Sequence, residues 1–181
     1  MNKFLTICLL VASFQLQAQR YLSKNAYVKF FSATPLEKIE AVNNSAVCIL
    51  DVSNGNLEFS ALNTAFQFEK ALMQQHFNEN YMESTTYPKT KFKGQIQNSS
   101  TIDFTKAGTH KITVAGDMSM HGVTKNITVP ANLIINANGK ISGEAKFKVK
   151  PEDYGIKIPS LVKDNIAKEI EITVKLEMSK M

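Results

Sequence analysis

The residue types that most often carry chemistry are few in this chain. It has three histidines, His76, His110 and His121, and two cysteines. No two of the histidines stand at the spacing of metal ligands on one element, and no cysteine accompanies them, so the sequence predicts no zinc site. It also lacks a nucleophile elbow, a phosphate-binding glycine loop and a dinucleotide fingerprint. We therefore expect no cofactor and no enzymatic activity.

The histidines and carboxylates that remain have both structural and functional interpretations. Asp117 and Glu144 alternate with apolar residues, where solvated surface charges are more common than a paired acid and base. His121 precedes a glycine at the end of a strand-like pattern, so it is either a turn residue bonded to the backbone or a polar group at a cavity mouth. His76 stands among apolar residues at helical spacing, which favours a partly buried structural histidine.

The N-terminus has the pattern of a cleaved secretory signal peptide. Lys3 supplies a positive charge, residues 4–14 form an apolar run too short to span a bilayer, and Ala18 offers a small side chain for cleavage. We therefore predict a signal peptide over residues 1–18, a periplasmic or secreted location, and no integral membrane segment in the mature chain. The length of the chain predicts a single domain, which we place over residues 21–181.

Cysteine usage predicts a fold without a disulfide bond. Cys8 falls within the predicted signal peptide, and the apolar run before it is too short for a lipid-attachment box. The mature chain then keeps Cys48 alone and cannot form an intramolecular disulfide. Cys48 stands in an apolar, β-branched run, which favours a small buried hydrophobe over a reactive thiol. Stability must therefore come from packing and strand pairing.

The predicted mature chain is modestly basic. The full chain has 21 basic and 16 acidic residues, and loss of Lys3 leaves a formal charge of +4. Arg20 is the single arginine, and lysines alternate along strand-like stretches, as at Lys89, Lys91 and Lys93. This spacing is typical of a solvated sheet face that also protects sheet edges. A nucleic-acid binder would cluster arginine with exposed aromatic residues, so we predict no nucleic-acid partner.

One stretch, residues 66–88, departs from strand alternation. Its apolar side chains recur at spacings of three, four and five, which predicts a helix of about three turns with one apolar face. That face would carry Phe68, Leu72, Met73, His76, Phe77 and Tyr81. Tyr87-Pro88 then restarts an extended chain, because the residue before proline is disfavoured in the α region. A lone helix among antiparallel strands usually plugs or covers the sheet that they form.

The rest of the chain alternates apolar and polar residues with period two, which predicts antiparallel strands with one solvated face. Asn54-Gly55 and Asn138-Gly139 indicate tight hairpins. Residues 36–43 fit either an extended segment or a helical turn, and residues 151–159 are irregular. The predicted strands, about eight in number, cover residues 27–33, 45–53, 56–63, 89–97, 110–120, 126–136, 140–150 and 170–178.

The apolar face of these strands is too large for one short helix to cover. Closing the sheet on itself buries the face and removes the edges. We therefore predict an all-β fold, a single elongated eight-stranded antiparallel β-barrel with one short helix between early strands. A two-sheet sandwich is the alternative. A membrane barrel is disfavoured, because its lumen would have to hold the lysines and glutamates.

The predicted inward face alternates large side chains with small ones. The small positions are Gly94, Gly116, Ala131, Gly143 and Ala145. Glycines inside strands can mark bends that let a barrel close. They can equally leave a channel lined by Met and Phe, which would suit an elongated lipid tail better than a compact polar metabolite. The sequence leaves both interpretations open.

Several short motifs follow one another along the chain in a distinctive order. They are Asn54-Gly55, His76-Phe77, Tyr87-Pro88 followed by Lys91-Phe92, Gly116 followed by the run HGVTK at residues 121–125, and DYGI at residues 153–156. In this order and spacing, they resemble the YceI-like family. The resemblance extends from about Tyr27 to Met178.

The resemblance implies a lipocalin-like barrel of bacterial periplasmic or secreted proteins, with a lumen that holds a polyisoprenoid or related amphiphile. The charged run that the family usually carries before its paired aromatics is missing. Residues 74–78 read QQHFN and residues 80–83 read NYME instead. With no arginine in the predicted barrel, a pyrophosphate head would depend on lysine, histidine and backbone donors.

These observations together predict a non-enzymatic protein that binds an isoprenoid or another fatty amphiphile. We expect the tail to be lined by Phe59, Phe68, Leu72, Met73, Phe77, Phe92, Met118 and Phe147. The candidates near the head group are His76, His121 and Tyr154. The alternative is a structural or protein-interaction module whose barrel is filled by its own side chains. The identity of the lipid and the formation of a homodimer are left open.

Overall fold

The computed structural model describes residues 19–181, so the predicted signal peptide and Cys8 lie outside the described residues. Most of the described chain is in strands. They are β1 (Arg20–Ala33), β2 (Lys38–Asp51), β3 (Asn56–Leu62), β4 (Gln67–Phe68), β5 (Lys89–Ile96), β6 (Gly108–Met120), β7 (Val123–Ile135), β8 (Ile141–Val149) and β9 (Ile170–Lys180).

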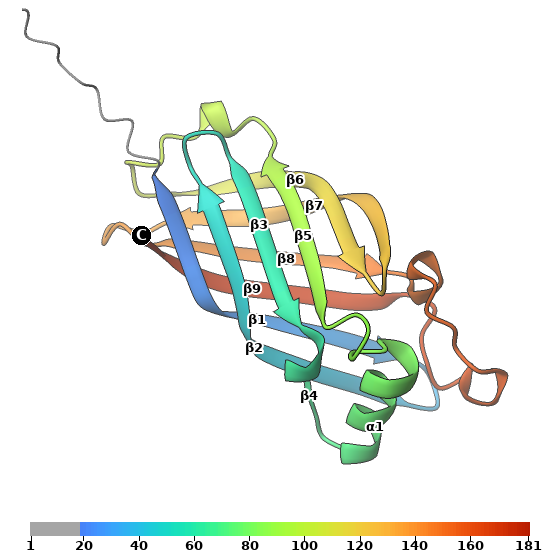
Figure 1. Cartoon of the computed structure of the whole chain (residues 1–181). Coiled ribbons are helices and arrows are strands. Elements are labelled where there is room, and N and C mark those ends of the chain that lie inside the picture. The colour runs from blue at the N-terminus through green and yellow to red at the C-terminus, as the bar shows by residue number, and fades with distance from the viewer. Residues whose placement is uncertain (1–18) are drawn as a thin grey trace, which may run out of the picture.

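Eight of these strands close into one antiparallel barrel (Figure 1). Their order is β1-β9-β8-β7-β6-β5-β3-β2, and pairing of β1 with β2 completes the ring. The short strand β4 pairs with β2 at Ala41 and Val42, beyond the end of β3. The predicted eight-stranded barrel is therefore confirmed, and the sandwich alternative is wrong.

The first two strands are longer than the sequence pattern indicates. Two consecutive exposed residues interrupt the alternation in each, Lys24-Asn25 in β1 and Asn44-Ser45 in β2. The β1–β2 register shifts at this level, as expected of bulges, which bend a strand and help a barrel to close. The buried Asn43 stabilises the irregular backbone, since its side chain donates to the Leu62 carbonyl (3.0 Å) and accepts from the Ser45 amide (2.8 Å).

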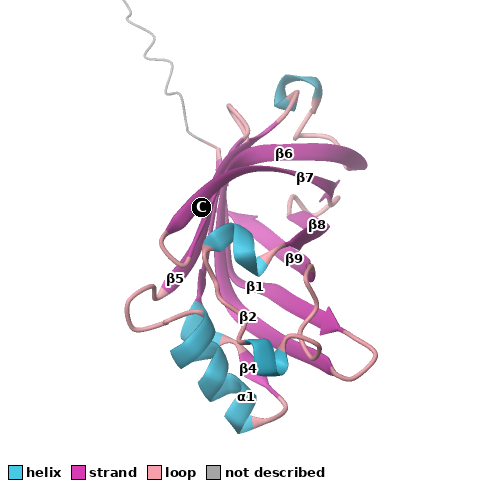
Figure 2. Cartoon of the chain, turned by 90° about the vertical axis from the view of Figure 1, so that its right-hand side faces the viewer, coloured by secondary structure: helices cyan, strands magenta, loops and turns pink. Residues whose placement is uncertain are grey.

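The predicted helix consists of α1 (Ala71–His76) and a π-helical continuation, η2 (Phe77–Tyr81). It begins later than the apolar pattern suggests, because Phe68 belongs to β4. The remaining helical turns are η1 (Asn63–Ala65), η3 (Ser99–Thr101), η4 (Pro151–Tyr154) and η5 (Ser160–Val162). Figures 1 and 2 show α1 beside one end of the barrel, near the turn that joins β1 to β2.

The two ends of the barrel differ in how they are filled. The closed end carries the β2–β3 and β7–β8 hairpins and the C-terminus (Figure 1). Behind it lies a cluster of buried side chains made of Tyr21, Cys48, Leu50, Ile96, Val114, Leu133, Ile135, Ile141 and Met178. The other end, here called the mouth, is bordered by the β1–β2 turn, α1, the β6–β7 hairpin and the segment between β8 and β9. Figure 2, in which this end of the barrel faces the viewer, shows these elements around its rim.

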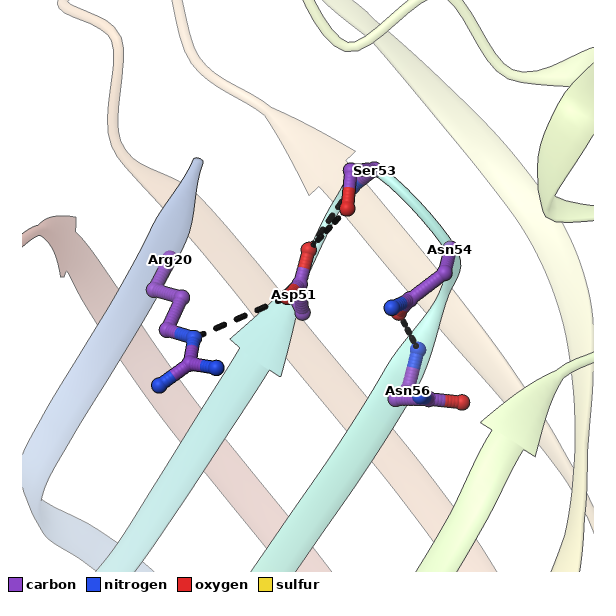
Figure 3. A network of polar contacts seen from close by, with 5 residues as sticks. All are labelled: Arg20, Asp51, Ser53, Asn54 and Asn56. Carbon is purple, nitrogen blue, oxygen red and sulfur yellow. Dashed lines mark hydrogen bonds and ion pairs between the residues drawn. The ribbon is translucent and has the colours of Figure 1, made fainter. Parts of the chain in front are cut away.

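A polar network fixes the hairpin at the closed end (Figure 3). Asp51 accepts hydrogen bonds from the backbone and hydroxyl of Ser53, and the Arg20 Nε lies 3.6 Å from its other oxygen. The bonds from Ser53 come first among the causes that hold the pKa of Asp51 below its usual value, and Arg20 adds to them. Asn54 accepts from the Asn56 amide across the turn (2.8 Å). The single arginine of the sequence therefore lies at the closed end of the barrel, far from the mouth.

Candidate functional site

The barrel encloses a cavity of about 390 Å³. This volume falls within the range of small-molecule sites. All eight barrel strands contribute side chains to its wall, as do α1, η2 and the segment between β8 and β9. His76 is exposed and still borders the cavity, so the wall opens to solvent beside α1.

The space exists because small residues meet on neighbouring strands. Ala131 on β7 pairs with Ala145 on β8, and the next inward pair sets Leu133 against Gly143. All four border the cavity. Short side chains at these positions leave a gap that larger ones would fill. The channel interpretation therefore holds for this part of the barrel.

The other two inward glycines serve closure of the sheet. Gly94 on β5 pairs directly with Gly116 on β6. A Cβ atom on Gly116 would collide with the Lys93 carbonyl oxygen and with the Gly94 Cα. Only glycine allows the two strands to approach so closely here. The bend interpretation therefore applies at this pair.

The cavity wall changes character from its deep end to the mouth. Near the closed end it is formed by Cys48, Leu57, Val114, Leu133 and Met178. At the mouth it includes polar side chains, namely Ser32, Glu37, Asn63, His76 and Asn165. Such a gradient can hold a molecule that is apolar at one end and polar at the other.

Most polar side chains at the mouth already have partners. Asn63 donates to the Tyr87 carbonyl (2.6 Å) and accepts from the Thr90 hydroxyl (2.9 Å). The Ser32 hydroxyl accepts from the Ala167 amide (2.9 Å). His76, by contrast, makes no side-chain hydrogen bond to any residue in the range 19–181. It is therefore the mouth residue best able to bond to a ligand.

The predicted tail residues border the cavity with one exception. Those on its wall are Phe59, Phe68, Met73, Phe77, Phe92, Met118 and Phe147. Leu72 is 61% exposed and lies off the wall. The phase of the helix accounts for this: Met73, His76 and Phe77 share the cavity face at spacings of three and four, whereas Leu72 lies about 100° from Met73 and about 140° from Phe77 around the helix axis. The prediction for Leu72 is therefore wrong, and ligand contact by the others remains a prediction.

Four aromatic rings attach the helix to the barrel. Phe77 stacks on Phe30 with ring centroids 5.4 Å apart. The centroid of the Phe77 ring also lies 5.1 Å from that of Phe68 and 5.6 Å from that of Phe66. All four border the cavity. Sequence reasoning missed Phe30 and Phe66, although the alternation within β1 could have identified Phe30. It also missed Ile158, Val162 and Ile166, which lie in a segment without periodic pattern.

His121 and Tyr154 do not border the cavity. His121 Nδ1 lies 3.0 Å from the Tyr154 carbonyl oxygen, and its Nε2 lies 3.2 Å from the Glu83 carboxylate. Its ring contacts that of Tyr87, with centroids 4.9 Å apart. The interpretation of His121 as a turn residue bonded to the backbone is therefore confirmed. Tyr154 is buried with Met82, Met118 and Met120, so neither residue is placed to reach a head group inside the cavity.

Metal binding and thiol chemistry find no support in the described part of the chain. Residues 19–181 contain no group of three His, Cys, Asp or Glu side chains that could hold a metal ion. Glu144 pairs with Lys175 (3.4 Å), as expected for a surface charge. Burial raises the pKa of the Cys48 thiol to about 12, so the thiolate that would react is suppressed. No helix in this range is long and apolar enough to cross a bilayer.

Comparison with known sequences places residues 24–178 in one family. The family model that matches them is described as a YceI-like domain. The match covers most of the described chain and agrees with the motifs from which the resemblance was inferred. No curated protein matches the sequence.

Solved structures share the fold. A polyisoprenoid binding domain from Saccharophagus degradans superposes with a TM-score of 0.79 at 12% identity, over 91% of this chain and 100% of that one. BcnA from Burkholderia cenocepacia gives 0.69 at 18% identity, over 85% and 96%. The YCEI protein of Campylobacter jejuni gives 0.57 at 16% identity, over 100% and 90%. At these identities the likeness establishes the architecture and leaves the ligand to be argued from the cavity.

Proposed function

This chain belongs to the YceI-like family, and from that premise we propose that it binds an isoprenoid or another long-chain amphiphilic lipid in the barrel. The tail lies toward the closed end and the head at the mouth. The observation that carries the proposal is the polarity gradient of the cavity wall, from Met178 and Leu133 at depth to His76 and Glu37 at the opening. The S. degradans neighbour, a polyisoprenoid binding domain, supports the same ligand class.

Burial of the tail supplies most of the affinity in this proposal. Each methylene removed from water contributes about 0.8 kcal/mol. Phe59, Phe92, Met118 and Phe147 offer it rings and a flexible thioether that adapt to an irregular chain. The aromatic group around Phe77 would contact the part of the tail nearest the mouth.

The head group would be bound without arginine. Arg20 belongs to the closed end, where it faces Asp51. His76 is the proposed donor on the wall, with exposed lysines around the opening as mobile counter-charges for an anionic head. Because lysine provides a point charge where arginine provides a planar fork, recognition of the head would be less geometrically selective than recognition of the tail.

We also propose that the protein acts as a periplasmic or secreted carrier without catalysis. The location rests on the signal-peptide pattern of residues 1–18. The absence of catalysis rests on the composition of the wall, in which the polar side chains at the mouth either bond to neighbouring side chains and backbone groups or, like His76, bond to no described residue. Whether the carrier works as a single copy or as a homodimer is independent of this proposal.

Native mass spectrometry tests the proposal. The protein, expressed from the full-length sequence in a bacterial host, should carry an apolar adduct in a one-to-one ratio that solvent extraction releases. Ala145→Phe places a ring in the gap opposite Ala131 and should abolish the adduct. Thr128→Phe adds the same ring to the exposed face of β7 and serves as the matched control, which should retain the adduct.

The alternative function, an interaction module with a filled barrel, gives the opposite pattern. A lumen already filled by side chains would make Ala145→Phe lose stability by overpacking, by about 1–3 kcal/mol. A clean apo mass that incubation with isoprenoids and fatty acids leaves unchanged would refute the lipid proposal. An adduct that survives in Ala145→Phe would place the lipid outside the cavity.

A further inference from the structure

Three leucines project into solvent around the mouth. Leu36 on the β1–β2 turn is 69% exposed, Leu72 on α1 is 61% exposed, and Leu161 on η5 is 95% exposed. None of them borders the cavity. Single exposed leucines are ordinary on a protein surface, but three at one opening call for a common cause.

The Glu37 carboxylate connects the three segments that carry these leucines. One of its oxygens lies 3.7 Å from Lys70 Nζ, two residues before Leu72. The other accepts a hydrogen bond from the Asn165 amide (3.0 Å), in the segment that contains Leu161. Leu36 is the residue next to Glu37. The β1–β2 turn, α1 and the β8–β9 segment are therefore joined, and Figure 2 shows them at the same end of the barrel.

We propose that the mouth docks onto an anionic lipid bilayer, with Leu36, Leu72 and Leu161 inserted at the interface between head groups and acyl chains. This inference rests on the proposed function, because it supplies the route by which a tail enters the cavity. A lipid leaving the bilayer between the three leucines would reach the apolar wall without crossing water. Short apolar side chains on separate loops are suited to shallow insertion.

The charges around the leucines favour an anionic surface. In residues 34–38, 69–76 and 156–169, the lysines that make no ion pair with a described residue are Lys38, Lys157, Lys163 and Lys168. The acidic residues of these ranges that likewise make no ion pair with a described residue are Glu69 and Asp164. Glu37 is bonded as above, and Glu169 pairs with Lys148 (3.2 Å). The unpaired charges are therefore positive in excess, and lysines near an anionic membrane surface are attracted to it.

The form of the surface argues against a protein partner. A protein interface needs a contiguous, largely apolar centre that excludes water. Here each leucine has charged neighbours in sequence, Glu37 beside Leu36, Lys70 near Leu72 and Lys163 near Leu161. A bilayer tolerates this pattern, because lysine can extend its charged end to the head groups while its stem lies along the apolar layer.

Flotation with vesicles tests the proposal. The protein should co-float with vesicles of phosphatidylglycerol and phosphatidylcholine, and less with phosphatidylcholine alone. The triple variant Leu36→Ser, Leu72→Ser and Leu161→Ser should weaken vesicle binding by at least about tenfold. Ile134→Ser removes an apolar side chain of similar size that is 37% exposed on β7 near the closed end, and it should bind as the unaltered protein does.

Lipid content separates this inference from the proposed function. The triple variant should keep its bound adduct in native mass spectrometry, because its cavity wall is unchanged, and its melting temperature should match that of Ile134→Ser. If the unaltered protein carries lipid but fails to float, docking is refuted and the lipid proposal stands. If light scattering shows a dimer that the triple variant dissociates, the leucines form an interface between copies and the docking proposal is overturned.

Discussion

His121 Nδ1 and the Tyr154 carbonyl oxygen lie 3.0 Å apart, 33 residues from one another in sequence. This contact joins the β6–β7 hairpin to η4. Because the carbonyl can only accept, Nδ1 donates this hydrogen bond, and the Glu83 carboxylate, which lies 3.2 Å from Nε2, is likewise an acceptor. His121 and Glu83 both have positive φ, 50° and 43°, a conformation that side chains other than glycine adopt at a cost. Their contact maintains two strained turns at the mouth.

Replacing His121 should therefore loosen the mouth more than its partial exposure suggests. We expect His121→Ala to lower the free energy of unfolding by about 1–2 kcal/mol, since it removes two polar contacts and leaves the positive φ in place. His121→Asn should lose less, because asparagine tolerates the left-handed region. Urea denaturation measures both.

The matched control for this prediction is His110→Ala. His110 is half-buried on β6 and makes no side-chain hydrogen bond to any described residue, so its loss should change stability by about 0.5 kcal/mol or less. Equal losses for the two alanine variants would mean that the contacts of His121 contribute nothing of their own.

The Tyr154 hydroxyl is buried and has no hydrogen-bond partner among the described residues. Burial is the main cause that raises its pKa, and Asp153 adds to it. An unpaired buried hydroxyl is unfavourable. We therefore expect Tyr154→Phe to leave the free energy of unfolding unchanged or to raise it by about 1 kcal/mol. Calorimetry at neutral pH measures the change.

Lipid retention in Tyr154→Phe decides whether Tyr154 has the head-group role that the sequence suggested. Its position off the cavity wall predicts that native mass spectrometry will find the adduct retained in full. Loss of the adduct without loss of stability would show instead that the hydroxyl bonds to the ligand. The same change at Tyr27, a half-buried tyrosine on β1 that does not border the cavity, controls for changes in handling and ionisation.

The stacked pair of Phe30 and Phe77 should hold the helix to the barrel. Each Phe→Ala change is expected to cost about 3 kcal/mol, as for other largely buried phenylalanines. In the double variant, the coupling energy between the two rings should be about 0.5–1.5 kcal/mol. A double-mutant cycle by urea denaturation measures this coupling. Pairing Phe30 with Phe104, which packs against the cluster at the closed end, gives a control, and a coupling as large for that pair would indicate general loosening of the barrel.

The periodic parts of the chain could be predicted and the aperiodic parts could not. Alternation in β6, β7, β8 and β9 identified their inward faces, because a strand that buries one face must alternate. It did not carry through the whole of β1 and β2, because bulges at Lys24-Asn25 and Asn44-Ser45 reset the phase, and only the parts of these strands that follow the bulges or lie beside them were predicted.

The candidate site followed the same division. Phe59, Phe92, Met118 and Phe147 belong to regular strands, and their place on the cavity wall could be predicted. Leu72 could not be placed, since a short helix preceded by a strand has a phase that tertiary packing sets. The side-chain contacts at the mouth, such as Glu37 with Asn165, join residues that no local pattern relates. They follow only from the closure of the barrel.

The buried thiol of Cys48 should make the free energy of unfolding depend on pH. Burial raises its pKa from 9.0 to about 12, so the folded state keeps the thiol proton where the unfolded chain has lost it. A raised folded pKa gives stability that is complete below pH 9 and declines as pH rises toward 12. In that window the Cys48 contribution to the free energy of unfolding should fall by up to about 1.4 kcal/mol per pH unit.

Comparison with Cys48→Ala isolates this contribution, because lysines and tyrosines titrate in the same window in both proteins. Urea denaturation from pH 8 to 11 should give a steeper decline for the unaltered protein than for Cys48→Ala, and any constant offset between them reflects lost packing. A thiol reagent at pH 8 should react only when urea unfolds the chain, since the thiolate is suppressed and the side chain is fully buried. Equal slopes, or rapid reaction in the folded state, would show that Cys48 is solvated through the cavity, and the deep end of the lumen would then hold water rather than a lipid tail.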